Sequence, residues 1–314
     1  MDWKTEFVEN MLGAYIDIDR IDYSLDLKFR NIPRKLYKYR EFDSNDSSIK
    51  NLVGNTVWMN SPENFNDPYD CALTFNPHRI SSPENSIRSF CESLGIPLGL
   101  MDRKMPNFLE QVNPAVSAVQ YFAKHGIIEQ DLADQVAAEL IRLTDEQIET
   151  FSNKVKKLSK VCAFSESNAS VLMWAHYARY HTGFCIEYDF TLLGKESLTT
   201  KLLYPVLYSE SLHDHTEHMA GIDITRANPL SIVLPVITKA PDWAYEKEWR
   251  LVYSNNFMAG PQSHAVPKPI KVYAGSKIKP ADLDKLQFIC SNLEIPLVRM
   301  TLSPTSFEII PAVS

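Results

Sequence analysis

The sequence predicts an α+β fold with a helical insertion. Two observations indicate it. Stretches rich in aromatic and β-branched residues, typical of strands, occur on both sides of residues 83–158, and helical periodicity replaces them inside that segment. The expected strands and helices do not alternate in the regular order that a parallel sheet of βαβ units requires. With 314 residues, the chain can bury a substantial core as one elaborated domain or as two.

Residues 1–30 are predicted to form a helix and a linker, ahead of a single α+β domain over residues 31–314. Apolar residues recur in the helix at intervals of four, namely Trp3, Phe7, Met11 and Tyr15. This spacing places them on one stripe that would face a core.

The segment before the insertion predicts short strands that alternate with turns. The expected strands are Leu36–Arg40, Thr56–Asn60 and Cys71–Phe75. A short helix over Asp46–Leu52 is expected to end at Gly54, and residues 61–70 form a turn-rich loop broken by Pro62 and Pro68.

Residues 83–158 predict three or four helices, two of them over Gln130–Arg142 and Asp145–Leu158. Strands then return over Val161–Ser165, Gly183–Asp189, Leu202–Tyr208, Glu248–Ser254, Ile270–Ala274 and Leu297–Leu302. Helices are expected between them near Ser170–Arg179, Ile224–Leu234 and Pro280–Leu293.

Composition narrows the classes of function. Hydrophobic and charged contents of 45% and 23% are ordinary for a globular protein, and the net charge of −7 argues against non-specific nucleic-acid binding by the whole surface. Two clusters of lysines, at 154–160 and 268–279, are solvated faces or line a phosphate path. With 10 glycines and no G-x-G-x-x-G or Walker loop, a Rossmann or P-loop nucleotide-binding domain is disfavoured.

The cysteines and the N-terminus indicate a compartment. The five cysteines form no C-x-x-C pair, which argues against a zinc knuckle, and their odd number and irregular spacing suit reduced thiols. The first residues lack the pattern of a signal peptide, and no apolar stretch approaches the length of a membrane span. A soluble cytoplasmic protein without membrane contact is expected.

The strongest candidate for a site is the strand expected at 248–254. Because side chains alternate along a strand, Glu246, Glu248 and Arg250 are predicted to share one face. Two carboxylates and a guanidinium are costly to bury without partners, so they favour a site over a core. The alternative is a solvated face of an edge strand.

Other candidates lie on earlier elements. Arg40, at the end of its strand, is either a surface cation or a binder of diphosphate, since a planar guanidinium can grip phosphate through two hydrogen bonds. Asp67 is expected to bond its own backbone in a turn, with a metal or substrate role as the alternative. The Ser165 hydroxyl, inside a strand, is free to face a ligand. His176 and Tyr177 lie on an aromatic helix that is either core or binding surface.

Six strings in order resemble a large bacterial family that is catalogued as a domain of unknown function, over about residues 34 to 275. They are L-Y-K-Y-R, S-P-E-N-F-N-D-P-Y-D, F-S-E, M-W-A-H-Y-A, G-F-C-I-E-Y and W-A-Y-E-K-E-W-R.

More distantly, the arrangement resembles the ADP-ribosyltransferase superfamily. Arg40 matches its basic residue on the first core strand, Ser165 its serine on a middle strand, and Glu246-Lys247-Glu248 its late E-x-E. The S-T-S triplet of that superfamily is absent, and Phe-Ser-Glu-Ser stands in its place. The resemblance implies a split β-sheet core and NAD as the substrate.

The resemblance also implies roles for the residues. Glu248, the first choice, would stabilise the oxocarbenium-like state formed when the nicotinamide–ribose bond breaks. Glu246 would position the acceptor or share the work, and the resemblance leaves open which of the two is catalytic. Arg40 would bind the diphosphate, and Ser165 would hold the active strand. Tyr39, or an aromatic of the helix that carries His176 and Tyr177, would stack on the cationic nicotinamide.

Three classes of function stay open. The first is ADP-ribosyl transfer from NAD to protein, DNA or RNA, without a metal, in a toxin or anti-phage defence setting that could include an antitoxin partner. The second is a metal-dependent nuclease or hydrolase that uses Asp67, His176, Glu246 and Glu248. The third is a non-catalytic binding module.

Overall fold

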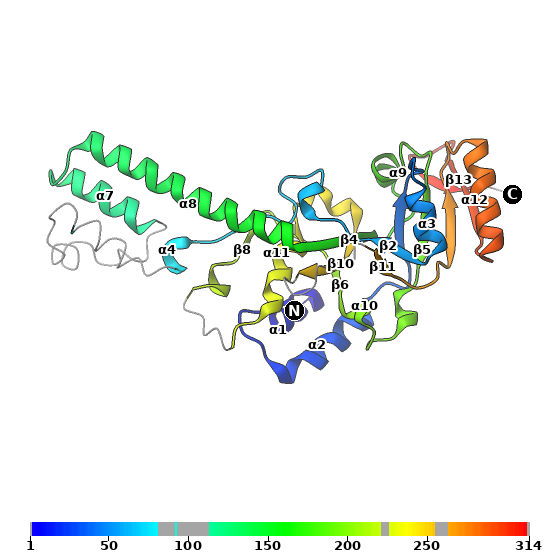
Figure 1. Cartoon of the computed structure of the whole chain (residues 1–314), viewed down its shortest axis with the longest axis horizontal. Helices are drawn as coiled ribbons and strands as arrows, with labels where there is room; N and C mark the ends of the chain where they lie inside the picture. The colour runs from blue at the N-terminus through cyan, green and yellow to red at the C-terminus, as the bar shows by residue number, and fades with distance from the viewer. Residues whose placement is uncertain (1, 81–91, 93–112, 221–225, 255–262, 313–314) are drawn as a thin grey trace.

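The computed structural model of the chain describes residues 2–80, 92, 113–220, 226–254 and 263–312. A β-sheet covered by helices lies at one end of an elongated molecule, and helices α7 (Pro114–Lys124) and α8 (Gln130–Leu158) form an arm that extends away from it (Figure 1). The predicted insertion is therefore an antiparallel helical arm in its described part. Strands and helices are mixed, as the predicted α+β class requires.

One large sheet holds the fold together. Its eight strands lie in the order β14-β13-β12-β5-β1-β4-β10-β6, and neighbours are antiparallel except β12 and β13. In chain order the strands are β1 (Leu36–Arg40), β4 (Ser159–Ser165), β5 (Phe184–Tyr188), β6 (Leu203–Pro205), β10 (Glu248–Ser254), β12 (Lys271–Ala274), β13 (Leu297–Leu302) and β14 (Ile309–Pro311).

The sheet opens between β1 and β4. Strand β1 pairs with β5 along its whole length, from Leu36 to Arg40, but its register with β4 contains only the pair Tyr37 and Ser165. Strand β4 pairs instead with β10 along its full length. The Lys38 ammonium donates a hydrogen bond across the opening to the carbonyl oxygen of Ala163, at 2.8 Å. The opening leaves room for a cavity inside the sheet.

Smaller strand pairs surround the sheet. They are β2 (Thr56–Trp58) with β11 (Ser263–Ala265), β3 (Leu73–Thr74) with β8 (His213–Asp214), and β7 (Leu207–Tyr208) with β9 (Thr238–Lys239). The remaining α-helices are α1 (Trp3–Met11), α2 (Ile18–Asn31), α3 (Ser47–Val53), α4 (Pro77–Ile80), α9 (Val171–Tyr177), α10 (Leu198–Lys201), α11 (Val233–Ile237) and α12 (Pro280–Asn292). The 3₁₀ turns are η1 (Pro62–Asn64), η3 (Phe190–Leu193), η4 (Thr216–His218), η5 (Pro229–Ile232) and η6 (Pro241–Glu246).

The two faces of the sheet bury different cores, because successive side chains of a strand point to opposite faces. One core contains Leu36 and Ile186 and packs against α3 and α12. The other contains Tyr37, Tyr39 and Trp174 and packs against α9. Tyr39 meets the ring of Trp174 edge to face, with ring centres 5.2 Å apart.

Gly183 sets the distance between the end of β1 and the turn after α9. A Cβ atom at this position would lie 2.1 Å from the carbonyl oxygen of Arg40 and 3.1 Å from that of Ala178. Any side chain would therefore push the Arg40 backbone away, and the site described below depends on that backbone.

Several sequence-based expectations are confirmed. Strands occupy Leu36–Arg40, Glu248–Ser254 and Leu297–Leu302 as predicted. The strand expected at Leu202–Tyr208 is two short strands, β6 and β7, separated at Val206. Of the helix expected at Ile224–Leu234, the first two residues lie outside the described residues. Residues 226–228 are not helical, and residues 229–234 form η5 and the start of α11.

Three other expectations were wrong. The linker expected before residue 31 is helix α2, whose Asp17 cap accepts a hydrogen bond from the Asp19 backbone. The two helices expected over 130–142 and 145–158 are the single helix α8, because neither glycine nor proline interrupts it. Tyr15 lies beyond the end of α1 and is 46% exposed, so it does not continue the apolar stripe.

No helix among the described residues is both long and apolar enough to span a membrane. The four described cysteines, Cys71, Cys162, Cys185 and Cys290, are buried free thiols, and Cys91 lies outside the described residues.

Lys28 of α2 is buried, and no carboxylate among the described residues forms an ion pair with it. Its ammonium donates to the carbonyl of Lys201 at 2.6 Å and lies 4.4 Å from the ring centre of Tyr204. Burial lowers the pKa of Lys28 to about 7. Between that value and the usual pKa of about 10.4, the unfolded chain holds a proton that the folded chain has lost, so folding becomes more favourable as pH rises.

We expect Lys28→Met to remove this pH dependence. The free energy of unfolding of the wild type should rise relative to that of the variant by more than about 1 kcal/mol between pH 7 and pH 9. Urea unfolding at several pH values measures the difference in the free energy of unfolding between the two proteins. Groups that titrate in the same way in both proteins do not contribute to this difference. A difference that stays constant over this range would contradict a neutral Lys28.

Candidate functional site

A cavity of about 250 Å³ lies in the opening between β1 and β4. Strands β1, β4 and β10, helix α9, turn η6 and the loop before β3 all contribute to its wall. Its polar lining residues include Lys38, Arg40, Asn60, Asn66, Asp70, Ser165, Tyr177, Lys239, Glu246, Glu248 and Arg250. Trp58 and Asn66, both exposed, lie where the cavity reaches the surface. The sheet thus brings charged side chains from distant parts of the chain to one enclosed space.

Arg250 is the centre of a buried ionic cluster. It is 0% exposed, and its two terminal nitrogens donate to the two carboxylate oxygens of Asp70, each at 2.8 Å. Its Nε donates to Glu248 at 2.8 Å, and Nη1 also donates to the carbonyl of Val236 at 2.6 Å. These partners satisfy a guanidinium that would otherwise be very costly to bury.

Lys239 of β9 joins this cluster to Glu246. Its ammonium donates to Glu248 at 2.9 Å and to Glu246 at 2.5 Å, and lies 3.7 Å from Asp70. Burial disfavours the charged form of Lys239, but Glu248 and Glu246 outweigh it and raise the pKa. The other Glu246 oxygen accepts a hydrogen bond from the Tyr177 hydroxyl at 2.7 Å.

The two glutamates differ in their pKa values. Burial acts to raise the pKa of Glu248, but Arg250 and then Lys239 outweigh it and hold the pKa at about 2. Burial raises the pKa of Glu246; Lys239 opposes the rise and Glu248 adds to it. Two neighbouring carboxyl groups with pKa values pushed apart are typical of a site in which one group handles protons and the other stays ionised.

The charges of the cluster explain this difference. The described members are three carboxylates, of Asp70, Glu246 and Glu248, and two cations, of Lys239 and Arg250. Arg250 contacts Asp70 and Glu248 but not Glu246, so Glu246 depends on a lysine that it shares. This excess of one carboxylate adds to burial, which is the larger cause of the raised pKa of Glu246.

The backbone places Glu246 in a way that the sequence did not predict. Glu246 ends the turn η6, Lys247 has a left-handed φ of 45°, and β10 begins at Glu248. The expectation that both glutamates alternate along one strand was therefore wrong. The Ser165 hydroxyl, fully buried, donates to the carbonyl oxygen of Glu246 at 2.6 Å and accepts from the Ser167 amide. Ser165 thus holds the Glu246 backbone against β4.

Arg40 brings an unpaired donor to the cavity. Its Nη2 atom is buried and finds no hydrogen-bond partner among the described residues. An unpaired buried guanidinium nitrogen is costly, and an anion in the cavity would satisfy it through a charge-assisted hydrogen bond.

The remaining predicted residues lie at different depths. The Tyr39 hydroxyl donates to the carbonyl of Ser167 at 2.8 Å, and burial raises the pKa of Tyr39. Tyr177 lines the cavity and is bonded to Glu246. His176, its neighbour, is exposed and is not a lining residue. Of the predicted set, the cavity contains Tyr39, Arg40, Ser165, Tyr177, Glu246 and Glu248.

The four residues proposed for a metal-dependent hydrolase do not come together. Asp67 accepts a hydrogen bond from the Tyr69 backbone at 2.9 Å, as expected of a turn residue, and is not a lining residue of the cavity. His176 is exposed on the far end of α9. Within the described residues, neither joins Glu246 and Glu248 in a group that could hold a metal.

The sequence analysis missed two members of the cluster, Asp70 and Lys239. Each is a charged residue beside an apolar strand, in the strings Pro-Tyr-Asp-Cys-Ala-Leu and Val-Ile-Thr-Lys-Ala-Pro. A charge inside an otherwise apolar stretch is a signal of a buried partner. The partner itself could not be found, because Asp70 and Arg250 are 180 residues apart.

Residues 173–251 match the model of a family described as a protein of unknown function, DUF2971. The matched range contains Tyr177, Lys239, Glu246, Glu248 and Arg250, which form most of the ionic cluster. The other cavity residues named above, from β1, the loop before β3 and β4, precede it. No curated protein and no solved structure matches the chain. The resemblance to ADP-ribosyltransferases stays a prediction.

Proposed function

We propose that the cavity binds NAD and that the protein transfers ADP-ribose from it to a macromolecular acceptor, with Glu246 as the reacting carboxylate. One observation carries the proposal. An unpaired buried guanidinium nitrogen of Arg40 and a carboxyl group of raised pKa, Glu246, line the same cavity. The first suits a diphosphate and the second suits a developing cation at a ribose.

The chemistry assigns different tasks to the two glutamates. Cleavage of the nicotinamide–ribose bond builds positive charge on the ribose, and a nearby carboxylate stabilises it and can accept the proton of the attacking group. Both oxygens of Glu248 accept hydrogen bonds from cations, Arg250 and Lys239, whereas only one oxygen of Glu246 accepts from a cation. Burial raises the pKa of Glu246, which favours proton acceptance, and Tyr177 and Lys239 fix its orientation. Glu246 therefore replaces Glu248 as the first choice.

The size of the cavity limits what it can enclose. Sites that bury most of a drug-sized ligand usually measure about 300–1,000 Å³. The cavity, at about 250 Å³, would enclose the nicotinamide and its ribose, and the adenosine half would extend past Trp58 and Asn66 toward the surface. The aromatic side chains of the lining, which include Tyr39 and Tyr177, offer faces to the cationic nicotinamide ring.

The proposal is tested by incubating the purified protein with labelled NAD and a cell extract. Label that moves to protein or to nucleic acid supports the transferase and identifies the class of acceptor. The proposal fails if NAD is neither cleaved nor transferred and does not change the thermal midpoint of the protein.

We expect Arg40→Lys to weaken NAD binding by about 10- to 100-fold, because a lysine cannot make the paired contacts of a guanidinium, and one charged hydrogen bond is worth about 1.5–3 kcal/mol. Isothermal titration with NAD measures the change. Arg34→Lys is the matched control, since Arg34 is exposed, precedes the same strand and does not line the cavity. Equal affinity in both variants would contradict the role of Arg40.

A further inference from the structure

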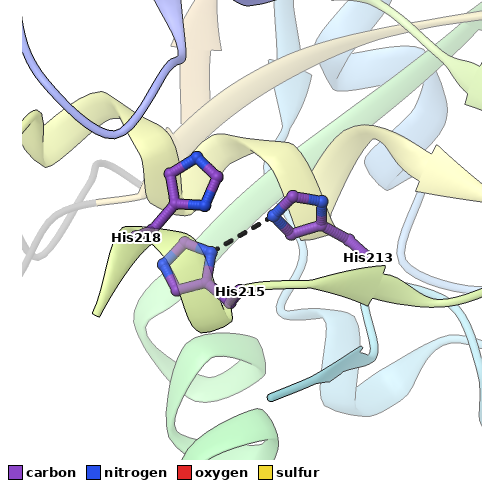
Figure 2. A group of neighbouring side chains, drawn as sticks. All are labelled: His213, His215 and His218. Atoms are coloured by element: carbon purple, nitrogen blue, oxygen red, sulfur yellow. Dashed lines mark hydrogen bonds between the residues drawn. The ribbon is translucent and has the colours of Figure 1, made fainter. Parts of the chain in front are cut away.

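Three histidines outside the cavity lie together on one short segment. His213 is on β8, His215 follows it, and His218 ends the turn η4 (Figure 2). One ring nitrogen of each lies within 4.8 Å of one from each of the others. None of the three lines the cavity that holds Glu246, so this cluster is separate from the site proposed for NAD.

We propose that His213, His215 and His218 bind one divalent transition-metal ion of the zinc type. The geometry points to this ligand set. In a tetrahedral site with Zn–N bonds of about 2.0–2.1 Å, neighbouring ligand nitrogens are about 3.3 Å apart. Nε2 of His213 and Nδ1 of His215 are 3.2 Å apart, close to that spacing. Three imidazoles leave the fourth position of the ion for water or another ligand.

His218 supplies an unsatisfied nitrogen. Its Nδ1 is buried and has no hydrogen-bond partner among the described residues. The ring of His218 stacks on that of His215 with centres 4.7 Å apart, and the ring centre of His213 lies 5.4 Å from each of them. Figure 2 shows one nitrogen of His218 directed toward the other two rings. A bound ion would satisfy a buried polar atom that is otherwise costly.

The surrounding fold holds the three rings in place before any ion binds. Strand β8 pairs with β3, and the His215 amide donates to the carbonyl of Thr74 at 2.8 Å. The Asp214 carboxylate accepts from the Thr216 amide at 2.9 Å, and the Thr216 hydroxyl accepts from the Asn76 amide at 2.7 Å. The ring of Phe151, on α8, lies 6.3 Å from that of His215. A rigid frame of this kind reduces the ordering cost of binding.

Each of the three rings must present a lone pair to a bound ion. Imidazole binds metals in its neutral form. The nitrogen that donates the hydrogen bond between His213 and His215 would pass its proton to the other nitrogen of its ring, so that both facing nitrogens present lone pairs.

Only zinc-type ions fit these ligands well. Imidazole suits Zn²⁺, Cu²⁺, Ni²⁺ and Co²⁺, whereas Mg²⁺ and Ca²⁺ prefer oxygen ligands. The cluster was not predicted from the sequence, because zinc ligands were considered there only as cysteine pairs. The string His-Asp-His-Thr-Glu-His nevertheless carries three histidines within six residues. His213 and His215, two apart on an extended segment, share a face, and the turn η4 returns His218 to it.

The test uses the full-length protein without a histidine tag, stripped with a chelator and titrated with ZnCl₂. We expect one equivalent to bind and the thermal midpoint to rise. Replacing the ion by Co²⁺ should produce the visible absorption of a tetrahedral site. Each of His213→Gln, His215→Gln and His218→Gln should weaken zinc binding by more than about 100-fold, since loss of a mere supporting contact already costs about 10- to 100-fold.

The matched control is His264→Gln. His264 is also buried, but its ring nitrogens face Thr199 and Tyr253, and it is not part of the cluster. This variant should bind zinc as the wild type does. The proposal is overturned if the wild type binds no stoichiometric zinc, and this measurement does not depend on the folding of any variant. It is also overturned if the three cluster variants bind zinc as tightly as His264→Gln. Neither result depends on whether NAD is the substrate.

Discussion

Glu246→Gln is expected to reduce ADP-ribosyl transfer by about 100- to 10,000-fold, the usual contribution of a positioned acid or base. The amide keeps an oxygen for the Tyr177 hydroxyl, which bonds Glu246 at 2.7 Å, but it cannot take a proton or carry the negative charge that a developing cation needs. Initial rates with labelled NAD, measured at saturating NAD, report the loss directly.

The same substitution should leave the protein stable. It removes one of three carboxylates that share two cations, and burial already raises the pKa of Glu246. A folded-state pKa above the unfolded one means that ionisation of Glu246 costs stability as pH rises through the folded value. We therefore expect Glu246→Gln to unfold in urea at or above the wild-type midpoint. Full activity in a folded variant would remove Glu246 from the mechanism.

Glu248→Gln, two residues away, is the informative comparison. Glu248 has a pKa of about 2 because Arg250 and Lys239 hold its charge, so its stabilising contribution is present above the usual pKa near 4.3 and is lost as pH falls toward 2. This variant should be destabilised at pH 7. If Glu248→Gln were stable but inactive while Glu246→Gln were stable and active, Glu248 would be the catalytic residue.

Arg250→Met is expected to cost about 3–5 kcal/mol of the free energy of unfolding, the usual effect of removing one partner from a buried ionic group. Asp70 and Glu248 would lose the hydrogen bonds that Arg250 now makes to them at 2.8 Å. Lys239 alone would then face three carboxylates. Urea unfolding at pH 7 measures the loss, and the deficit should shrink at acid pH as the carboxyl groups become protonated.

A double variant separates this effect from simple loss of packing. Adding Asp70→Asn to Arg250→Met removes one of the unpaired charges, so part of the lost stability should return. Loss of packing alone would make the two substitutions additive or worse. A cost below about 1 kcal/mol for Arg250→Met would show that the ionic cluster contributes little to folding.

Prediction from the sequence succeeded where the signal is local. The strand over Glu248–Ser254 was found from its β-branched and aromatic residues, and the cap residue Gly54 ends α3 as expected. The same local reasoning failed at Glu246. Lys247 adopts a left-handed φ of 45°, which no strand pattern signals, and this turn carries Glu246 out of the strand.

The length of α8 shows a second limit. Its two halves carry helical periodicity, and the sequence predicted them as separate helices on either side of Leu143 and Thr144. A helix continues where no residue forbids it, and the Thr144 hydroxyl bonds to the carbonyl of Leu140 within the same helix.

The sequence by itself determined the α+β class, most of the strands, and the presence of Arg40, Ser165, Tyr177 and the two glutamates as candidates, because periodicity and residue chemistry are local properties. Only the tertiary structure decided which candidates meet. The opening of the sheet between β1 and β4 creates the cavity, and Asp70 and Lys239 come from distant segments to join Glu246, Glu248 and Arg250 there. In this cluster Arg250 and Lys239 hold the pKa of Glu248 low, whereas burial raises that of Glu246. Electrostatic roles depend on distances through space, and spacing along the chain does not determine them.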